Sequence, residues 1–136
     1  MDNITVLGSG PTKYVYNHPS KETLEYFDSP SKHPYNIHII CPEFTSLCPK
    51  TGQPDFATII IDYVPNNFCI ESKSLKLYLF SFRQFGEFHE ACINRMADDI
   101  HEVIKPIYIK VVGQFMPRGG ISIWPTVERG NNVYNF

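Results

Sequence analysis

The stretch DFATIIIDYV, residues 55–64, carries the clearest strand pattern of the sequence. Ala57, Ile59, Ile61 and Tyr63 occupy every second position, which is the two-residue period of a β-strand with one buried face. We therefore predict a strand over residues 55–64 and place the other elements around it.

Three further strands and one loop can be assigned outward from this strand. Residues 35–40 are β-prone and precede it. Residues 41–54 hold three prolines and a glycine, a composition that cannot propagate a helix and that predicts a rigid, exposed turn. Two more strands are predicted at residues 108–116 and 121–124, on either side of the turn at residues 117–120.

Two helices are predicted between the strand pairs. Residues 72–82 are apolar at helical spacing and are followed by Gly86, and residues 89–104 repeat apolar side chains with a helical period until Pro106 ends them. The order β, β, α, α, β, β predicts an α+β fold, in which an antiparallel four-stranded sheet carries both helices on one face. The other face needs a cover, and at this size self-association is a natural solution.

The chain of 136 residues is long enough for one domain and too short for two. We assign residues 1–136 to a single domain, in which residues 1–34 form an irregular N-terminal arm with a helical turn possible at residues 21–27.

The bulk charge and the apolar pattern exclude several classes of protein. A net charge of -2 lacks the basic excess that neutralises nucleic-acid phosphates, so direct nucleic-acid binding is not expected. The sequence starts with neither a basic nor an apolar leader region and has no run long enough to span a bilayer, so we expect a cytoplasmic protein. Its cysteines should then be reduced, and the absence of a CxxC pair argues against a metal site.

Cys48 is the cysteine whose surroundings favour chemistry. A thiol is a useful nucleophile only as a thiolate, in a partly exposed place where cations or hydrogen-bond donors lower its pKa. Cys48 lies in the proline-rich turn, with the hydroxyl groups of Thr45 and Ser46 before it and Lys50 after it. The default for Cys41, Cys69 and Cys92 is a buried structural role.

Two interpretations of this segment compete. The spacing of Pro42, Thr45 and Cys48 matches the peroxiredoxin pattern, in which a thiolate attacks a peroxide and a second cysteine, here Cys92, resolves the sulfenic acid. A peroxiredoxin cysteine begins a helix, however, and here three helix-breaking residues and a strand follow. We therefore rank the thiol peroxidase second.

The first interpretation uses four blocks between residues 41 and 123: CPKTGQPDF at residues 48–56, ESKSLKLY at residues 71–78, FHE at residues 88–90 and PRGG at residues 117–120. Together they resemble the NADPH-dependent nitrile reductases called QueF. The resemblance implies reduction of 7-cyano-7-deazaguanine to the 7-aminomethyl base for queuosine biosynthesis. It also implies the short, single-module form of the T-fold, a homo-oligomer assembled as a barrel (a decamer of two stacked pentamers), with active sites between subunits. A non-catalytic purine-binding relative is a third interpretation, against which the retention of Cys48 and Asp55 argues.

The resemblance assigns the catalytic pair. Cys48 matches the family's nucleophile, which adds to the nitrile carbon and leaves a thioimidate, and Asp55 matches the proton donor. Asp55 must carry a proton when it donates, which apolar surroundings such as Phe56 would favour. Two NADPH are consumed per nitrile. Without the resemblance, a turn residue or a strand-start cap is the simpler interpretation of Asp55.

The resemblance also assigns binding residues. Glu90 matches the purine anchor beside His89, although an acid in the first turn of a helix is also an ordinary stabilising feature. The other predicted substrate contacts are Ile70, Glu71 and Ser72, of which Ser72 could instead be a helix cap. NADPH phosphates need cations, and the candidates are Lys73, Lys76 and Arg118. No metal is expected, and a Cys48–Cys92 disulfide on oxidation is a weaker hypothesis.

Overall fold

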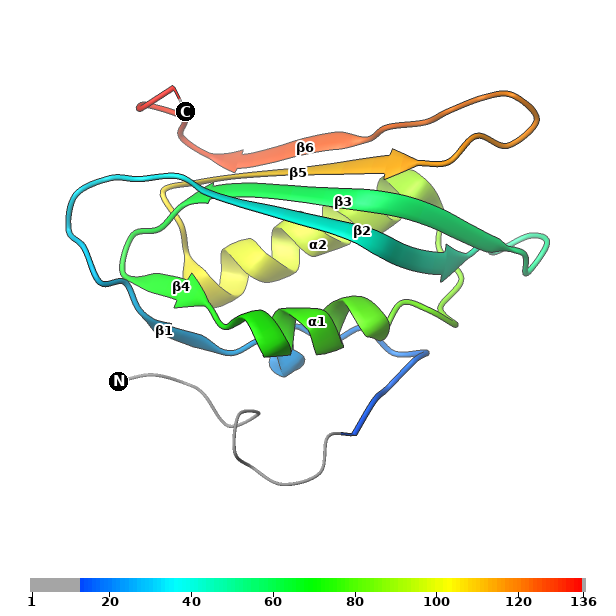
Figure 1. Ribbon diagram of the computed structural model, residues 1–136, viewed down its shortest axis with the longest axis horizontal. Helices are drawn as coiled ribbons and strands as arrows, with labels where there is room; N and C mark the ends of the chain where they lie inside the picture. Colours follow the sequence, from blue (N-terminus) through cyan, green and yellow to red (C-terminus); the bar gives the residue numbers. More distant parts are fainter. Residues whose placement is uncertain (1–12, 136) are drawn as a thin grey trace.

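The structure is a computed structural model and describes residues 13–135. Its elements, in chain order, are a 3-10 turn η1 (Lys21–Thr23), β1 (Tyr26–Asp28), β2 (Ile37–Leu47), β3 (Pro54–Val64), β4 (Phe68–Ile70), α1 (Ser72–Phe80), α2 (His89–Ile104), β5 (Tyr108–Phe115) and β6 (Thr126–Gly130). The antiparallel sheet has the order β2-β3-β5-β6, and β1 and β4 form a small second sheet. Both helices lie on one face of the large sheet (Figure 1), which confirms the predicted α+β T-fold.

The core lies between that face and the two helices. The alternating residues of β3 are buried as predicted, and Ile93, Met96 and Ile100 of α2 pack against them without exposed surface. Helix α2 approaches β5 closely at Gly113, where an added Cβ atom would lie 2.6 Å from the Ile93 side chain. Only glycine fits at this crossing without a shift of the Ile93 or Phe115 side chain.

Strand β2, predicted at residues 35–40, extends further than predicted. It continues from Ile37 through Pro42 to Leu47, with a register shift between Cys41 and Phe44, and the predicted turn at residues 41–54 contracts to residues 48–53. Proline removes a backbone donor, but β2 is an edge strand and the register shift lies at this point, so no ladder hydrogen bond has to be made there.

The prediction of a last strand at residues 121–124 is wrong. These residues lie in the loop between β5 and β6, where Ile121 and Trp124 are exposed. The strand is instead Thr126–Gly130, whose Val127 pairs with Val111 and faces the core. The strand was predicted too early because the loop residues are β-prone. β-propensity does not reveal how long the connection is before the strands pair.

The N-terminal arm is more ordered than predicted where the structure describes it. Residues 1–12 of the predicted arm lie outside the described residues. The predicted helical turn at residues 21–27 is only the 3-10 turn at Lys21–Thr23, followed by β1 paired with β4. Within residues 13–135, no helix has the length and apolar character needed to cross a membrane.

Candidate active site

The loop at residues 48–53, between β2 and β3, is fixed by its own backbone. The Cys48 N–H donates to the Gln53 carbonyl at 2.8 Å, and the Gly52 N–H donates to the Cys48 carbonyl at 2.9 Å. Gly52 has a φ of 71°, a left-handed conformation that glycine adopts without strain. The thiol of Cys48 therefore sits on a closed turn and is partly exposed.

Hydrogen-bond donors of this turn activate the thiol. The Thr51 hydroxyl, followed by the backbone N–H groups of Thr51 and Lys50, lowers the pKa of Cys48 from its ordinary value of 9.0 to about 7, and Arg118 contributes in the same direction. About half of the thiol is then thiolate at neutral pH. Thr45, which the sequence predicted as a donor to the thiol, is engaged elsewhere, because its hydroxyl group donates to the Asp55 carbonyl at 2.8 Å.

Asp55 lies at the start of β3 on the helix side of the sheet and is 5% exposed. Its carboxylate contacts the Arg118 Nε at 2.5 Å and lies 3.8 Å from the His89 Nδ1. Phe56 is on the opposite face of the strand and 52% exposed, because neighbouring strand residues point to opposite faces. The expected apolar surroundings of Asp55 are therefore wrong, since its carboxylate faces a guanidinium group and an imidazole ring.

His89 begins α2 and faces Asp55. Its ring stacks on Phe115 with 3.8 Å between the ring centroids. Among the described residues, three buried side-chain polar atoms have no hydrogen-bond partner, and two of them, the Ser46 Oγ and the His89 Nδ1, belong to residues next to Asp55. Buried polar atoms are normally paired, so this place is suited to a polar ligand.

Glu90 follows in the first turn of α2 and is exposed. The N-cap position, Phe88, offers no side-chain hydrogen bond, so first-turn N–H groups and the Glu90 carboxylate share an accessible helix end. The Glu90 carboxylate is therefore accessible to a ligand, and an ordinary role in helix stabilisation is compatible with this position.

A short segment that the sequence reasoning missed connects the Cys48 loop to α2. The Leu47 N–H donates to the Phe85 carbonyl and the Glu87 N–H donates to the Leu47 carbonyl, both at 3.1 Å. Glu87 in turn binds Arg95 of α2 through a contact of 2.8 Å. A parallel bridge of this kind leaves no periodic pattern, so no sequence signal could have revealed it.

Ile70, Glu71 and Ser72 lie elsewhere. Ile70 is the last residue of β4, and Glu71 and Ser72 follow it, near the Val64 end of β3. The nine steps of strand from Asp55 to Val64 span about 30 Å. Figure 1 shows the Cys48 loop and the start of α2 at one end of the sheet and the start of α1 towards the other. Within one chain, these three residues are therefore not part of the group around Cys48.

Glu71, and not Ser72, is the cap of α1. Its carboxylate accepts hydrogen bonds from the backbone N–H groups of Lys73 and Ser74, both at 2.8 Å, and the residue is 4% exposed. Ser72 is exposed beside it. A glutamate that accepts from two N–H groups fills the position that the sequence reasoning gave to a serine hydroxyl.

The three predicted cofactor-binding cations also lie in two separate places. Lys73 and Lys76 are on α1, whereas Arg118 contacts Asp55 and lies 3.5 Å from the Gln53 carbonyl. Arg118 thus belongs to the group around Cys48 in this chain. Within residues 13–135, no cluster of three or more His, Cys, Asp or Glu side chains is placed to hold a metal ion.

Cys92 is fully buried in α2, and burial raises the pKa of its thiol. Cys48 opens no helix, because the turn leads directly into β3. The thiol peroxidase interpretation requires a reactive cysteine at the start of a helix and a second cysteine that is accessible to it. Neither requirement is met by Cys48 and Cys92 in this structure.

The fold is that of a small T-fold subunit, in which Arg118 contacts the buried Asp55 carboxylate and contributes to the lowered pKa of the Cys48 thiol. The family model described as QueF-like protein matches residues 54–134, a range that includes Asp55, His89 and Arg118.

Curated relatives cover nearly the whole chain. A protein of Streptococcus thermophilus is 54% identical over 131 residues, which are 96% of this chain and 80% of the relative. A protein of Bacillus cytotoxicus is 55% identical over 133 residues, with 96% and 79% covered. Both are named NADPH-dependent 7-cyano-7-deazaguanine reductase. The chain belongs to the QueF family, which confirms the family predicted from the sequence.

A solved structure supports the fold separately. The apo form of an archaeosine synthase described as QueF-Like superposes with a TM-score of 0.68 at 20% identity, and the match covers 74% of this chain and 98% of the other. At this identity the likeness concerns the fold alone.

Proposed function

We propose that this protein is an NADPH-dependent oxidoreductase that reduces the nitrile of 7-cyano-7-deazaguanine to 7-aminomethyl-7-deazaguanine. The observation that carries the proposal is that Arg118 joins the activated thiol of Cys48 to the buried carboxyl group of Asp55, in a chain 54% identical to reductases of that name. The product is the aminomethyl base of queuosine biosynthesis.

Cys48 performs the first step as a nucleophile. Its thiolate adds to the electrophilic nitrile carbon, so that a carbon–sulfur bond forms while one carbon–nitrogen π bond breaks, and the nitrogen takes a proton from Asp55. The product of this step is a thioimidate on Cys48. NADPH supplies a hydride twice. After the first hydride the carbon–sulfur bond breaks and Cys48 leaves as a thiolate, and after the second the imine becomes the amine, so two NADPH and two protons are consumed.

Arg118 and His89 lie next to the Asp55 carboxyl group. In the unliganded chain the Asp55 carboxylate is engaged by Arg118, and a carboxyl group that donates a proton must first exchange this contact for another. The single proton that Cys48 loses when it becomes a thiolate is available to Asp55 in the same site. The unpartnered Nδ1 of His89, 3.8 Å from Asp55, is positioned to stabilise the nitrogen of the adduct.

Glu90 supplies recognition of the base. A guanine-like ring presents neighbouring N–H donors on one edge, and a carboxylate that accepts both fixes the ring in orientation. Glu90 at the exposed start of α2 serves this role, with His89 beside it.

The remaining contacts come from a second copy of the chain. Ile70, Glu71 and Ser72 lie towards the Val64 end of β3, whereas Asp55 is at its other end, so they contribute to the same site only if another subunit brings them there. A homo-oligomer with sites between subunits, of the barrel type with two stacked pentamers, satisfies this requirement and covers the open sheet face.

The proposal is tested by the stoichiometry of the reaction. The protein is incubated with 7-cyano-7-deazaguanine and a limiting amount of NADPH, and the product and the NADPH that remains are measured together. The expected product has gained four hydrogens, and two NADPH disappear for each. A nitrile that returns unchanged, or a ratio of one, would contradict the proposal.

A further inference from the structure

Residues 85–87, called the connector below, lie between α1 and α2 and run against the Cys48 loop. The Leu47 N–H donates to a connector carbonyl and the Leu47 carbonyl accepts from a connector N–H, both at 3.1 Å. A Cβ atom added to Gly86 would lie 3.3 Å from the Pro49 Cα. The connector is therefore in direct backbone contact with the strand end and the turn that carry the reactive thiol.

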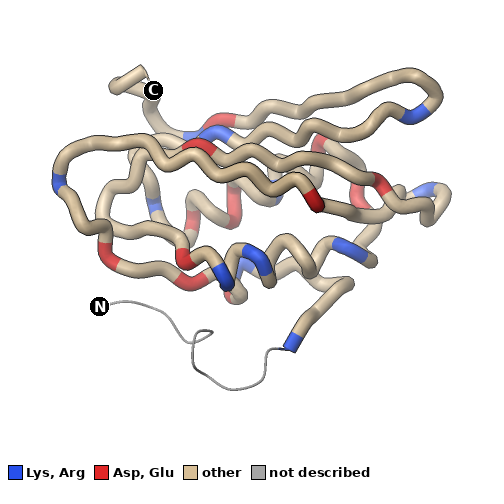
Figure 2. Tube along the Cα trace, in the orientation of Figure 1, with Lys and Arg blue, Asp and Glu red and all other residues tan. Residues whose placement is uncertain are grey.

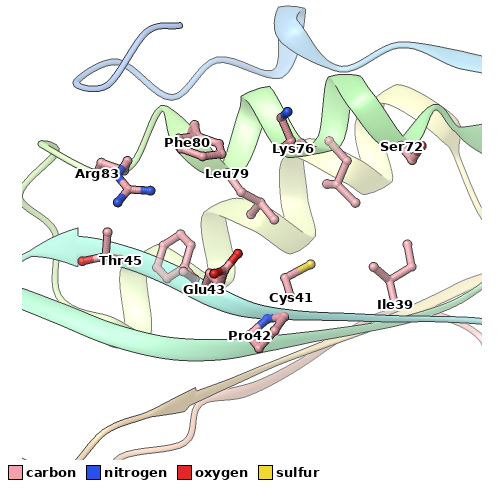
Figure 3. A pocket seen from close by; sticks show the side chains of 12 residues that line it. Ile39, Cys41, Pro42, Glu43, Thr45, Ser72, Lys76, Leu79, Phe80 and Arg83 are labelled. Atoms are coloured by element: carbon pink, nitrogen blue, oxygen red, sulfur yellow. The ribbon is translucent and has the colours of Figure 1, made fainter.

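The packing of α1 does not by itself fix the place of the Cys48 loop. A groove of about 460 Å³ separates β2 from α1, and Figure 3 shows the side chains of the two elements facing each other across it, with Thr45 and Arg83 towards one end. A cavity of this size means that the two elements do not interdigitate closely along this stretch. The position of the loop relative to the helices therefore depends on contacts beyond α1, of which those of the connector reach the loop itself.

Arg95 of α2 holds the connector from the helix side. Its Nε and Nη2 donate to both carboxylate oxygens of Glu87 at distances between 2.8 and 3.2 Å, and its guanidinium group lies 5.3 Å from the Phe85 ring centroid. A bidentate arginine–carboxylate pair fixes orientation as well as distance. Arg95 thus contacts both the first and the last residue of the connector.

Glu87 is not the partner that the helix alone would give to Arg95. Arg95 is the only Lys or Arg in α2, four residues of α2 are acidic, and Figure 2 shows acidic residues along this helix. Asp99 lies four positions after Arg95, a spacing at which charges on a helix surface pair, but its carboxylate accepts a hydrogen bond from the Tyr78 hydroxyl at 2.7 Å. The Arg95 side chain reaches back to the connector instead.

The start of α2 is where the place of the Cys48 loop matters for the reaction. Phe88, the N-cap residue, makes no side-chain hydrogen bond, and His89 and Glu90 follow it directly. In a rigid base held by Glu90, the nitrile carbon lies at a fixed distance from the recognised edge. Cys48 can then attack only if its loop keeps one position relative to α2.

The contact between Arg95 and Glu87 affects this position more than it affects stability. The Arg95 side chain is 38% exposed, and ion pairs of such exposure contribute little to the free energy of unfolding. A misplacement of reacting atoms by about 1 Å, in contrast, can slow a reaction about a hundredfold.

We propose that Arg95 is a positioning residue of the reaction. Through Glu87 it holds the connector, and with it the Cys48 loop, at a fixed place relative to His89 and Glu90. The inference rests on the proposed function and adds to it a residue outside the site that sets the approach of the thiolate to the nitrile carbon.

The inference is tested by the kinetics of adduct formation. The full chain is mixed with increasing concentrations of 7-cyano-7-deazaguanine without NADPH, and quenched mass measurements give the maximal rate and the half-saturating concentration. Arg95→Met should lower the maximal rate about tenfold to a hundredfold. The half-saturating concentration should change by less than about threefold, because Glu90 remains on an intact helix. A merely structural role would leave the maximal rate per folded chain unchanged.

Two further measurements separate positioning from activation of the thiol. The pH midpoint of Cys48 alkylation should stay at about 7 in Arg95→Met, because the main donors to the thiol belong to its own turn. Arg95→Lys keeps the charge without the bidentate geometry and should recover part of the lost rate. Glu87→Gln combined with Arg95→Met should be no slower than Arg95→Met alone, since both changes remove the same contact.

Arg129→Met is the matched control. Arg129 lies on β6, has a side chain that is 34% exposed, and also forms an ion pair with α2, through Asp98 at 2.8 Å. Its replacement should leave the maximal rate within about twofold of the wild type. An unchanged maximal rate in Arg95→Met, or an equal loss in Arg129→Met, would overturn the inference.

Hydrogen exchange keeps the test independent of the proposed function. In Arg95→Met the amides of Leu47 and Glu87, which form the two backbone bonds of the connector, should exchange about tenfold faster. The Cys92 amide, which donates to the Phe88 carbonyl within α2, should exchange as in the wild type. Unchanged exchange at Leu47 and Glu87 overturns the inference. Failure of the proposed function is a separate observation, because it appears as a wild type that forms no adduct while the exchange rates are still measured.

Discussion

The two ends of strand β3 differ in what they offer to a ligand. At the Asp55 end, an activated thiol, a carboxylate bound to Arg118 and an unpartnered His89 nitrogen lie close together. At the Val64 end, Glu71 is satisfied by its helix cap and Ser72 is exposed. Under the proposed function, one end supplies the reacting groups and the other supplies substrate contacts, so that a complete site would require two copies of the chain.

The largest effect is expected at the Asp55 end. Asp55→Asn removes the proton donor and should slow adduct formation with the nitrile by about a hundredfold to ten-thousandfold. Asp62→Asn is the matched control on the same strand, because Asp62 lies on the other face and binds His38 at 2.7 Å. Stopped-flow or quenched mass measurements check both. A loss of less than about threefold in Asp55→Asn would remove Asp55 from the mechanism.

Mixed oligomers test whether the two ends cooperate between chains. Cys48→Ala and Ser72→Tyr should each be inactive alone, the second because a bulky side chain blocks the exposed substrate contact. Refolded together in equal amounts, they should recover about a quarter of the wild-type activity, since one site in four receives an intact Cys48 end from one chain and an intact Ser72 end from another. A mixture as inactive as its parents would contradict a shared site.

The reactivity of Cys48 should depend on pH in a defined direction. The pKa of this thiol is lowered to about 7, so alkylation by iodoacetamide should rise as the pH increases through about 7 and reach a plateau above about 8. Thr51→Val removes the largest cause and should move the midpoint towards 9.0, the ordinary value, with slower alkylation at pH 7. An unchanged midpoint in Thr51→Val would show that other groups activate the thiol.

The smallest effect is expected at the Val64 end. Glu71→Ala removes the cap of α1 and should lower the free energy of unfolding by about 1 kcal/mol, measured by chemical denaturation. Glu102→Ala is a suitable control, because it removes only an exposed ion pair with Lys21, which is worth less than about 1 kcal/mol. Equal stability of Glu71→Ala and the wild type would mean that the two cap hydrogen bonds contribute nothing.

Much of the fold could be predicted from local patterns. The alternation in β3 and the helical period of α2 are set by burial against one common core, so the period identified both elements and the bounds of α2 agree with the prediction. β2 was predicted too short because Pro42 is tolerated at a sheet edge, and edge position is a tertiary property. β6 was misplaced because its register with β5 depends on the length of the hairpin.

In the candidate site, too, the sequence predicted what local residues determine and missed what tertiary contacts determine. Cys48 was found from its turn, since the activating donors lie within a few residues of it. The contact between Arg118 and Asp55 joins residues 63 positions apart in the chain, and Arg118 was assigned only to a phosphate. The cap formed by Glu71 was given to Ser72, because both residue types accept N–H groups and only the backbone geometry distinguishes them.

The most direct test of the central claim is the mass of the intact protein after incubation with 7-cyano-7-deazaguanine in the absence of NADPH. We predict that the mass of the wild type increases by that of one nitrile per chain, because the thioimidate forms and no hydride is present to resolve it, and that the Cys48→Ala mass is unchanged. No adduct on the wild type, or an adduct that survives Cys48→Ala, would contradict the assignment of Cys48 as the nucleophile.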